Sequence, residues 1–264
     1  NTASIIEHVE KQKGIFYEKC LKTSIDHDKK DKQLNFHLIV PGFNVSKWLR
    51  KCLESIKRQE YDNYTVTYID DLSTDNSVEI FDKAASDNKN FQALINNEKK
   101  YALKNISQAI ENLSASPDDI IVVLDADDWL SGPDVLNYLN STYQESNCWM
   151  TYGSYMYYPF GEMGKEPSQY PEETITNNDY RSDTWRASHL RTFKKKLWDK
   201  IDQKDFIDKD GEYYKMSYDQ AMMLPMLEMS GERAIFIPEV LHVYNRANEL
   251  NVDKIKQGEQ YKTI

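Results

Sequence analysis

Apolar positions follow two patterns along residues 36–135. Short apolar runs rich in β-branched and aromatic residues predict strands over 36–41, 64–69, 91–95 and 120–124. Apolar residues recurring every three or four positions predict helices over 45–56, 77–85 and 101–113. Ser46 is placed to cap the first helix, and 73–77 offers several N-caps for the second. Strands that alternate with helices indicate an α/β fold with a mostly parallel central sheet flanked by helices.

The pattern after residue 136 is less regular. An alternating aromatic stretch at 148–160 predicts a strand, and 161–183 is polar and irregular. We expect helices over 194–201, 221–229 and 252–261, and two short strands at 234–237 and 240–244. Residues 1–35 carry mixed charge and are expected to form an N-terminal helix and a charged linker.

Composition narrows the class of protein. The chain has 264 residues and a formal net charge of −10, which argues against nucleic acid as the main partner. Three cysteines without metal-type spacing make a disulfide framework or a zinc site improbable. No apolar run approaches the roughly 20 residues of a membrane helix, so we expect a soluble, cytoplasmic protein. The chain begins at Asn1 rather than Met, which leaves open that it is a fragment.

Three carboxylates directly follow the apolar run at 120–124. They belong to the segment Asp125-Ala126-Asp127-Asp128, where like charges beside a buried strand call for a cation. If strand geometry continues, Asp125 and Asp127 point to one side and Asp128 to the other. All-oxygen ligands favour Mg²⁺ or Mn²⁺ and suggest a nucleotide or diphosphate. The competing interpretation is a surface turn that caps a helix starting near Pro133.

A second acidic pair, Asp70 and Asp71, ends the strand at 64–69. Ligands of open parallel sheets bind outside the carboxyl ends of the strands, so the two acidic groups are expected at one edge. The first pair can accept hydrogen bonds from a base or ribose, and the second can hold a metal with a diphosphate. The sequence lacks a Gly-rich phosphate loop, so metal dependence is favoured.

Together these motifs resemble the inverting family-2 glycosyltransferases of the GT-A fold, which are nucleotide-diphospho-sugar transferases. The matching stretches are Ile39-Val40-Pro41-Gly42-Phe43-Asn44, Trp48-Leu49-x-x-Cys52-Leu53-x-Ser55-Ile56, Tyr68-Ile69-Asp70-Asp71-x-Ser73-Thr74-Asp75-Asn76-Ser77 and Leu124-Asp125-Ala126-Asp127-Asp128. The resemblance implies a single Rossmann-like domain over 36–264. Its nucleotide-sugar half would be 36–135 and its acceptor half 136–264.

The resemblance also implies a UDP-sugar donor. It carries Pro41 and Phe43 to the region of the donor base, and Asp70 or Asp71 to the uracil or ribose. It carries Asp125 to the ribose and, with Asp127, to a bound Mn²⁺ or Mg²⁺.

The family often has Ala-Arg-Asn before its central helix, where the arginine meets the diphosphate. Lys104 stands near that place in this chain. Lysine supplies charge without the bidentate fork of arginine, so this residue departs from the family pattern. A solvated helix residue is the competing interpretation.

On the acceptor side, Asp219 resembles the family's catalytic base, with Tyr-Asp in place of the usual Glu-Asp. A plain helix cap is the alternative. His242 is a candidate metal ligand by resemblance to transferases that use a late histidine, and a structural role is the alternative. Trp185 and His189 are candidates to line the acceptor pocket.

The predicted function is a metal-dependent inverting transfer of a hexose from a UDP-sugar to an acceptor hydroxyl. The acceptor would be a glycan, a protein side chain such as hydroxylysine, or a lipid-linked intermediate. Aspartyl-phosphate chemistry fares poorly, because the first strand ends in Pro41-Gly42-Phe43 rather than in a nucleophilic aspartate. A catalytically silent nucleotide-sugar or carbohydrate-binding module remains the main alternative.

Overall fold

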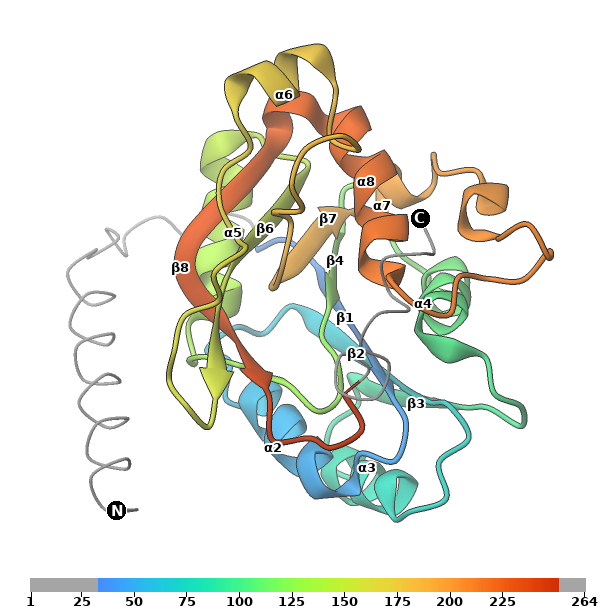
Figure 1. Ribbon diagram of the computed structural model, residues 1–264. Helices are drawn as coiled ribbons and strands as arrows, with labels where there is room; N and C mark the ends of the chain where they lie inside the picture. Colours follow the sequence, from blue (N-terminus) through green and yellow to red (C-terminus); the bar gives the residue numbers. More distant parts are fainter. Residues whose placement is uncertain (1–32, 252–264) are drawn as a thin grey trace.

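An eight-stranded sheet runs through residues 33–251, which are the residues that the computed structural model describes (Figure 1). The strands are β1 Phe36–Gly42, β2 Tyr64–Asp70, β3 Phe91–Ile95, β4 Ile120–Val123, β5 Trp129–Leu130, β6 Met150–Tyr158, β7 Arg191–Lys194 and β8 Ala234–Asn245. Their order across the sheet is β3-β2-β1-β4-β7-β6-β8-β5. Only β7 and β5 run against the other strands, which confirms a mostly parallel sheet.

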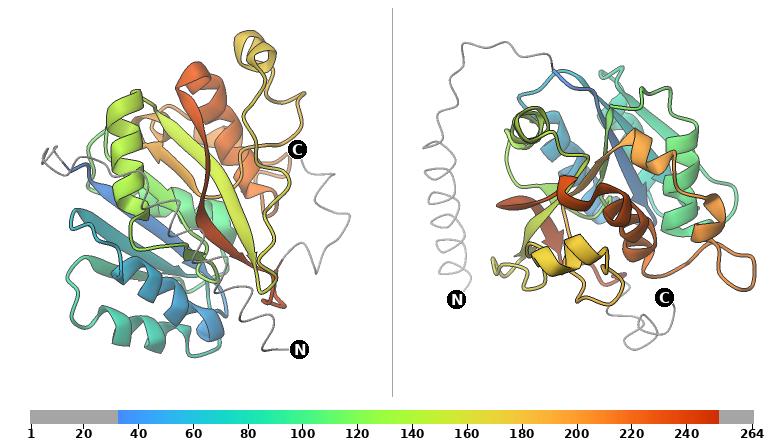
Figure 2. Two further views of the ribbon diagram at one scale, coloured as in Figure 1. Left: turned by 90° about the vertical axis from the view of Figure 1, so that its left-hand side faces the viewer. Right: turned by 90° about the horizontal axis from the view of Figure 1, so that it is seen from above.

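Helices cover both faces of this sheet (Figure 2). They are α2 Ser46–Lys57, α3 Ser77–Ala85, α4 Tyr101–Glu111, α5 Val135–Ser146, α6 Glu172–Asn177, α7 Lys195–Trp198 and α8 Tyr218–Ser230, with short 3-10 turns at Gln203–Phe206 and Gly231–Arg233. One core cluster joins the sheet to α2, α3 and α5, and the other joins it to α4, α7 and α8. This is the layered arrangement expected of βαβ units.

The central strands contribute side chains to both clusters. In β1, Leu38 and Val40 face the α2 side and Ile39 faces the α4 side, and all three are fully buried. In β4, Val122 faces the α2 side and Val123 the α4 side. Strands buried on both faces are apolar without interruption, which is why their sequence pattern was easy to detect.

The caps of the first two helices differ from the prediction. The N-cap of α2 is Val45 and no side chain caps it from that position, so the prediction for Ser46 was wrong. Asp75 serves both helices instead, because its carboxylate oxygens accept the Ser46 N–H at 2.9 Å and the Ser77 N–H at 3.0 Å. This contact ties the loop after β2 to the loop after β1.

The second half departs further from prediction. Residues 234–245 form one strand rather than two, and residues 191–194 form a strand just before a helix of only four residues. The polar segment at 161–183 contains the short helix α6. The predicted helix at 252–261, and nearly all of the helix and linker predicted at 1–35, lie outside the described residues.

Candidate active site

The loops after β1, β2 and β4 meet at one edge of the sheet. The Asp71 N–H donates to the Gly42 carbonyl at 2.9 Å, and the Ala126 N–H donates to the Pro41 carbonyl at 3.0 Å. Glycine is required at position 42, because an added Cβ would lie 2.8 Å from the Ala126 Cβ. The two acidic groups therefore flank the end of β1, on the same rim, as the sequence predicted.

The carboxylates of the first pair are fully engaged by the protein. Asp70 is buried and accepts the Tyr68 hydroxyl and the Ser73 N–H, both at 2.9 Å. Asp71 accepts backbone N–H groups from Lys100 and Tyr101, at 2.8 and 3.0 Å, besides other donors. Burial raises the pKa of Asp71, but these hydrogen bonds outweigh it and hold the pKa below its usual value.

An exposed aromatic surface lies next to Asp71. Lys99 pairs with the Asp71 carboxylate at 3.2 Å, and its Nζ lies 3.0 Å from the centre of the Phe43 ring. Phe43, Leu72 and Tyr101 are each about 40% exposed, at 38%, 42% and 40%. Leu72 and Tyr101 also have left-handed backbones, with φ of 67° and 64°. Strained, exposed apolar residues of this kind are typical of ligand sites.

In the acidic turn Asp128 is buried, whereas Asp125 and Asp127 are partly exposed. Strand β4 ends at Val123, so the strand alternation assumed for Asp125 and Asp127 does not apply to this turn. Asp125 accepts the Tyr218 hydroxyl, which lies 2.8 Å from each carboxylate oxygen. Asp127 accepts the side-chain amide of Asn248 at 2.7 Å. Burial, followed by the charges of Asp128 and Asp125, raises the pKa of Asp127 to about 8.

Asp128 lies beside two histidines rather than facing away from the site. Its Oδ2 is 2.8 Å from the Nε2 of His242, whose ring stacks on that of His189 with centroids 4.3 Å apart. Burial, followed by the charge of Asp125, raises the pKa of Asp128, while burial lowers the pKa of His242 to about 3. Both shifts favour an uncharged pair in which the protonated Asp128 donates to His242.

These three residues form the group with metal-ligand geometry among residues 33–251. Potential ligand atoms of Asp128, His189 and His242 all lie within 4.8 Å of one another. The Nδ1 atoms of both histidines are buried and have no hydrogen-bond partner within residues 33–251. Once Asp128 gives up its proton, its carboxylate and two neutral imidazoles offer a donor set that fits a divalent cation. His189, predicted on the acceptor side, thus lies with His242.

Asp219 faces the acidic turn from the start of α8. It lies in the first turn of the helix, whose N-cap is Ser217. The Nη2 of Arg191 lies 3.3 Å from the Asp219 Oδ2 and 3.3 Å from the His189 Nε2. Tyr218 therefore ties the start of the helix to the acidic turn, and Asp219 ties it to Arg191 on β7.

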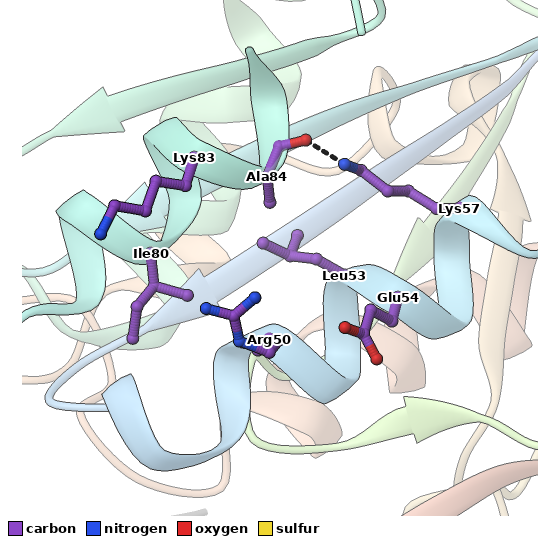
Figure 3. Close-up of a pocket in the computed structure, with 7 residues that line it drawn as sticks. All are labelled: Arg50, Leu53, Glu54, Lys57, Ile80, Lys83 and Ala84. Carbon is purple, nitrogen blue, oxygen red and sulfur yellow. Dashed lines mark hydrogen bonds between the residues drawn. The ribbon is translucent and has the colours of Figure 1, made fainter. Parts of the chain in front are cut away.

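The remaining predicted residues are less closely tied to this centre. Lys104 is half-buried on α4, and its ammonium has no ion-pair or hydrogen-bond partner among the residues described. Trp185 is half-buried and packs against the core cluster on the α4 side. A surface cavity of about 150 Å³ lies elsewhere, between α2 and α3, lined by Arg50, Leu53, Glu54, Lys57, Ile80, Lys83 and Ala84 (Figure 3).

Four residues of this centre were not identified from the sequence: Asp128 as a partner of the histidines, Arg191, Tyr218 and Lys99. No local signal pointed to Asp128, whose contact with His242 depends on the pairing of β5 with β8. Nothing in the sequence marks Arg191, which reaches the site only through the pairing of β7 with β4.

The sheet order and the acidic loops at the carboxyl ends of its strands define a Rossmann-like, GT-A type of nucleotide-sugar-binding domain. The family model described as "Glycosyl transferase family 2" matches residues 37–203, which is more than half of the chain. The chain therefore belongs to glycosyl transferase family 2, and the prediction of a glycosyltransferase is confirmed at that level.

Curated relatives of this chain are named as glycosyltransferases. The chain is 30% identical over 121 residues to glycosyltransferase GlyG of Streptococcus pneumoniae, covering 46% of this chain and 39% of that protein. It is 34% identical over 93 residues to glycosyltransferase GlyA of the same organism, covering 35% of this chain and 13% of that protein. The matches thus span less than half of these relatives.

Solved structures share the fold. TarS 1-349 of S. aureus in complex with UDP-GlcNAc superposes with a TM-score of 0.62 at 15% identity, covering 88% of this chain and 61% of that one. The mannosyltransferase PcManGT of Pyrobaculum calidifontis, in complex with GDP-Man and Mn²⁺, gives 0.55 at 15% identity, covering 98% and 69%. Within residues 33–251, none of the helices has the length and apolar character needed to cross a membrane.

Proposed function

We propose that this domain is a metal-dependent inverting glycosyltransferase that moves a hexose from a UDP-sugar to an acceptor hydroxyl. The observation that carries the proposal is the meeting of three elements at one rim. They are the Asp71 loop, the acidic turn with its two histidines, and Asp219 at the start of α8. These can serve the base, the diphosphate and the acceptor respectively.

The donor base is proposed to lie on the exposed surface formed by Phe43, Leu72 and Tyr101. Pro41 is buried at the end of β1 and shapes this end of the site, and Lys99 covers the Phe43 ring. Both carboxylates already accept hydrogen bonds from the protein, and Asp70 fixes the loop. Asp71 is the acidic residue of this pair assigned to uracil or ribose, because its partner Lys99 lies against the exposed Phe43 ring; the ligand would replace one of its present donors.

The metal site is proposed at Asp128, His189 and His242, with Asp125 and Asp127 beside it. Burial, and after it the charges of neighbouring carboxylates, raises the pKa values of Asp127 and Asp128, and a divalent cation would offset both effects. Two imidazoles in the donor set favour Mn²⁺ over Mg²⁺. When bound, such a cation neutralises the leaving diphosphate as a Lewis acid. Asp125 would bind the ribose, and Lys104 would add positive charge on the α4 side.

Asp219 is proposed as the catalytic base. The acceptor hydroxyl would give its proton to the Asp219 carboxylate while its oxygen bonds to the anomeric carbon. The bond between that carbon and the diphosphate oxygen breaks on the opposite face, which inverts the configuration. Arg191 holds the carboxylate in place, and the partly exposed Asp219 side chain remains accessible to an acceptor. Trp185 would lie on the acceptor side of the site.

The proposal can be tested with a panel of UDP, UDP-glucose, UDP-GlcNAc and GDP-mannose, each with and without Mn²⁺. Binding to the folded protein raises its melting temperature by mass action. Asp219→Asn should keep the metal-dependent shift with UDP and lose donor hydrolysis. Asp210→Asn, an exposed carboxylate outside the site, is the matched control.

Three results would contradict parts of the proposal. The absence of any metal-dependent shift with the whole panel would remove the donor assignment. Donor binding without hydrolysis or transfer in the wild-type protein would favour a silent binding module instead. Hydrolysis that survives Asp219→Asn unchanged would move the base elsewhere.

A further inference from the structure

Arg191 is a buried cation with unused hydrogen-bonding capacity. Its side chain is 4% exposed, and its Nη2 makes two long contacts of 3.3 Å, to Asp219 and His189. Its Nε and Nη1 are buried and have no partner among the described residues. A guanidinium carries five N–H donors, and leaving them unpaired away from water is costly. Residues 33–251 alone do not satisfy the donors of this side chain.

The backbone fixes Arg191 at the acidic turn. β7 runs antiparallel to β4, and Arg191 pairs with Val123, the last residue of β4 before Leu124 and Asp125. The groups that act on its charge are Asp219, Asp125, Asp128, Tyr218, His189 and His242. Burial lowers the pKa of Arg191, but Asp219, Tyr218 and Asp125 outweigh this and raise it. The side chain therefore remains a cation between the proposed base and the proposed metal ligands.

We propose that Arg191 binds a phosphate oxygen of the donor diphosphate. This rests on the proposed function, and it adds a residue that the sequence motifs did not include. Lys104, the residue at the expected arginine position, can provide charge but not a planar fork of donors. Arg191 has two unpaired N–H-bearing nitrogens beside the metal-ligand group, where the diphosphate of a bound donor must lie. A guanidinium held there before the reaction also stabilises the charge that develops on the leaving group.

The test compares how tightly UDP, UMP and uridine bind in the presence of Mn²⁺, measured by titration calorimetry. Arg191→Gln should weaken UDP binding about ten- to a hundredfold, as expected for losing one or two charge-assisted hydrogen bonds. Uridine binding should stay unchanged, because the base surface does not include Arg191. The UDP affinity of Arg191→Lys should fall between those of the wild type and Arg191→Gln. Arg58→Gln removes an arginine whose side chain is 77% exposed and is the matched control.

A structural role of Arg191 predicts different results. If folded Arg191→Gln keeps the wild-type ratio of UDP to uridine affinity, the proposal is wrong, even when hydrolysis is lost. It is also wrong if weaker Mn²⁺ binding without nucleotide, measured by electron paramagnetic resonance, accounts for the whole loss. If the glutamine variant does not fold, the lysine variant is judged by the same criteria. A wild-type protein that binds no UDP would instead remove the proposed function itself.

Discussion

The two acidic groups at the sheet edge differ in how the protein compensates their negative charge. Asp71 is surrounded by protein donors and keeps a low pKa, so its carboxylate is ready and charged without any ligand. Asp127 and Asp128 lie beside Asp125, and their pKa values are raised, first by burial and then by the charges of neighbouring carboxylates. The first group is organised by the chain itself, whereas we propose that a cation completes the second. Substitutions and pH should therefore affect the two groups differently.

The largest effect is expected at the acidic turn, where we propose that the cation binds. Asp128→Asn removes the carboxylate that joins His242 to the turn, and should reduce sugar transfer by about a thousandfold, or ~4 kcal/mol of barrier. The measurement is kcat at saturating Mn²⁺ and donor. Asp87→Asn, on the exposed loop before β3, should have no effect. Retention of full Mn²⁺-dependent activity in Asp128→Asn would place the metal outside the Asp128–His189–His242 group.

The second prediction breaks the contact that holds the two groups together. Gly42→Ala would place a Cβ 2.8 Å from that of Ala126, and should lower the free energy of unfolding by about 1–3 kcal/mol. Denaturant unfolding followed by circular dichroism measures this loss. Adding Ala126→Gly to the variant removes the opposing atom, so the double variant should recover part of the stability. Additive losses would mean that the contact between the loops is not the cause.

The pH dependence of stability should separate the groups directly. The pKa of Asp127 rises from its unfolded value near 4 to about 8, so the native state binds more protons than the unfolded state between these values. Without metal, stability should therefore fall as pH rises from about 6.5 to 8, by at most ~1.4 kcal/mol per pH unit for one proton. Between about pH 4 and 6.5 the lowered pKa of His242, about 3, gives a slope of the opposite sign that offsets this fall, because the unfolded histidine binds the proton. Asp71, whose pKa is lowered, loses its contribution only as pH falls below about 4.

Chemical unfolding at several pH values, with and without Mn²⁺, measures this slope. Mn²⁺ replaces the proton, so saturating metal should flatten the curve. Asp127→Asn should remove only part of the slope of stability against pH, because the pKa of Asp128 is raised as well. A metal-free protein whose stability is constant from about pH 6.5 to 8 would contradict the raised pKa values at the acidic turn.

The nucleotide half could be predicted from sequence because its signals are local. Strands β1 and β4 are apolar runs buried on both faces, and the helices of this half have apolar residues at regular spacing. Asp70, Asp71 and Asp125 follow directly from those strand ends, and parallel strands bring such ends to one edge. Their placement at one rim therefore needed no knowledge of distant residues.

The rest of the site depends on contacts between distant residues. His242 meets Asp128 across 114 positions of the chain, and β5, with two residues, is too short to give a pattern. The prediction that Asp128 faces away assumed an extended strand, but β4 ends at Val123 and the turn rotates the carboxylates. Arg191 lies in a four-residue strand that had been assigned in part to a helix. Its pairing partner sets its position, and no local signal does.

The smallest predicted effect is at the Asp71 group. Lys99 pairs with Asp71 and covers Phe43, but its side chain is 29% exposed, so its contribution is screened by solvent. Lys99→Gln should weaken both UDP and uridine binding by about fivefold, or ~1 kcal/mol, since it acts where the base is proposed to bind. Lys89→Gln, an exposed lysine before β3, is the control. The equal loss for both ligands distinguishes Lys99 from Arg191, for which only ligands with a diphosphate should be affected. If Lys99→Gln weakens UDP but leaves uridine unchanged, Lys99 contacts the phosphates, and the separation between a base end and a phosphate end of the site fails at this residue.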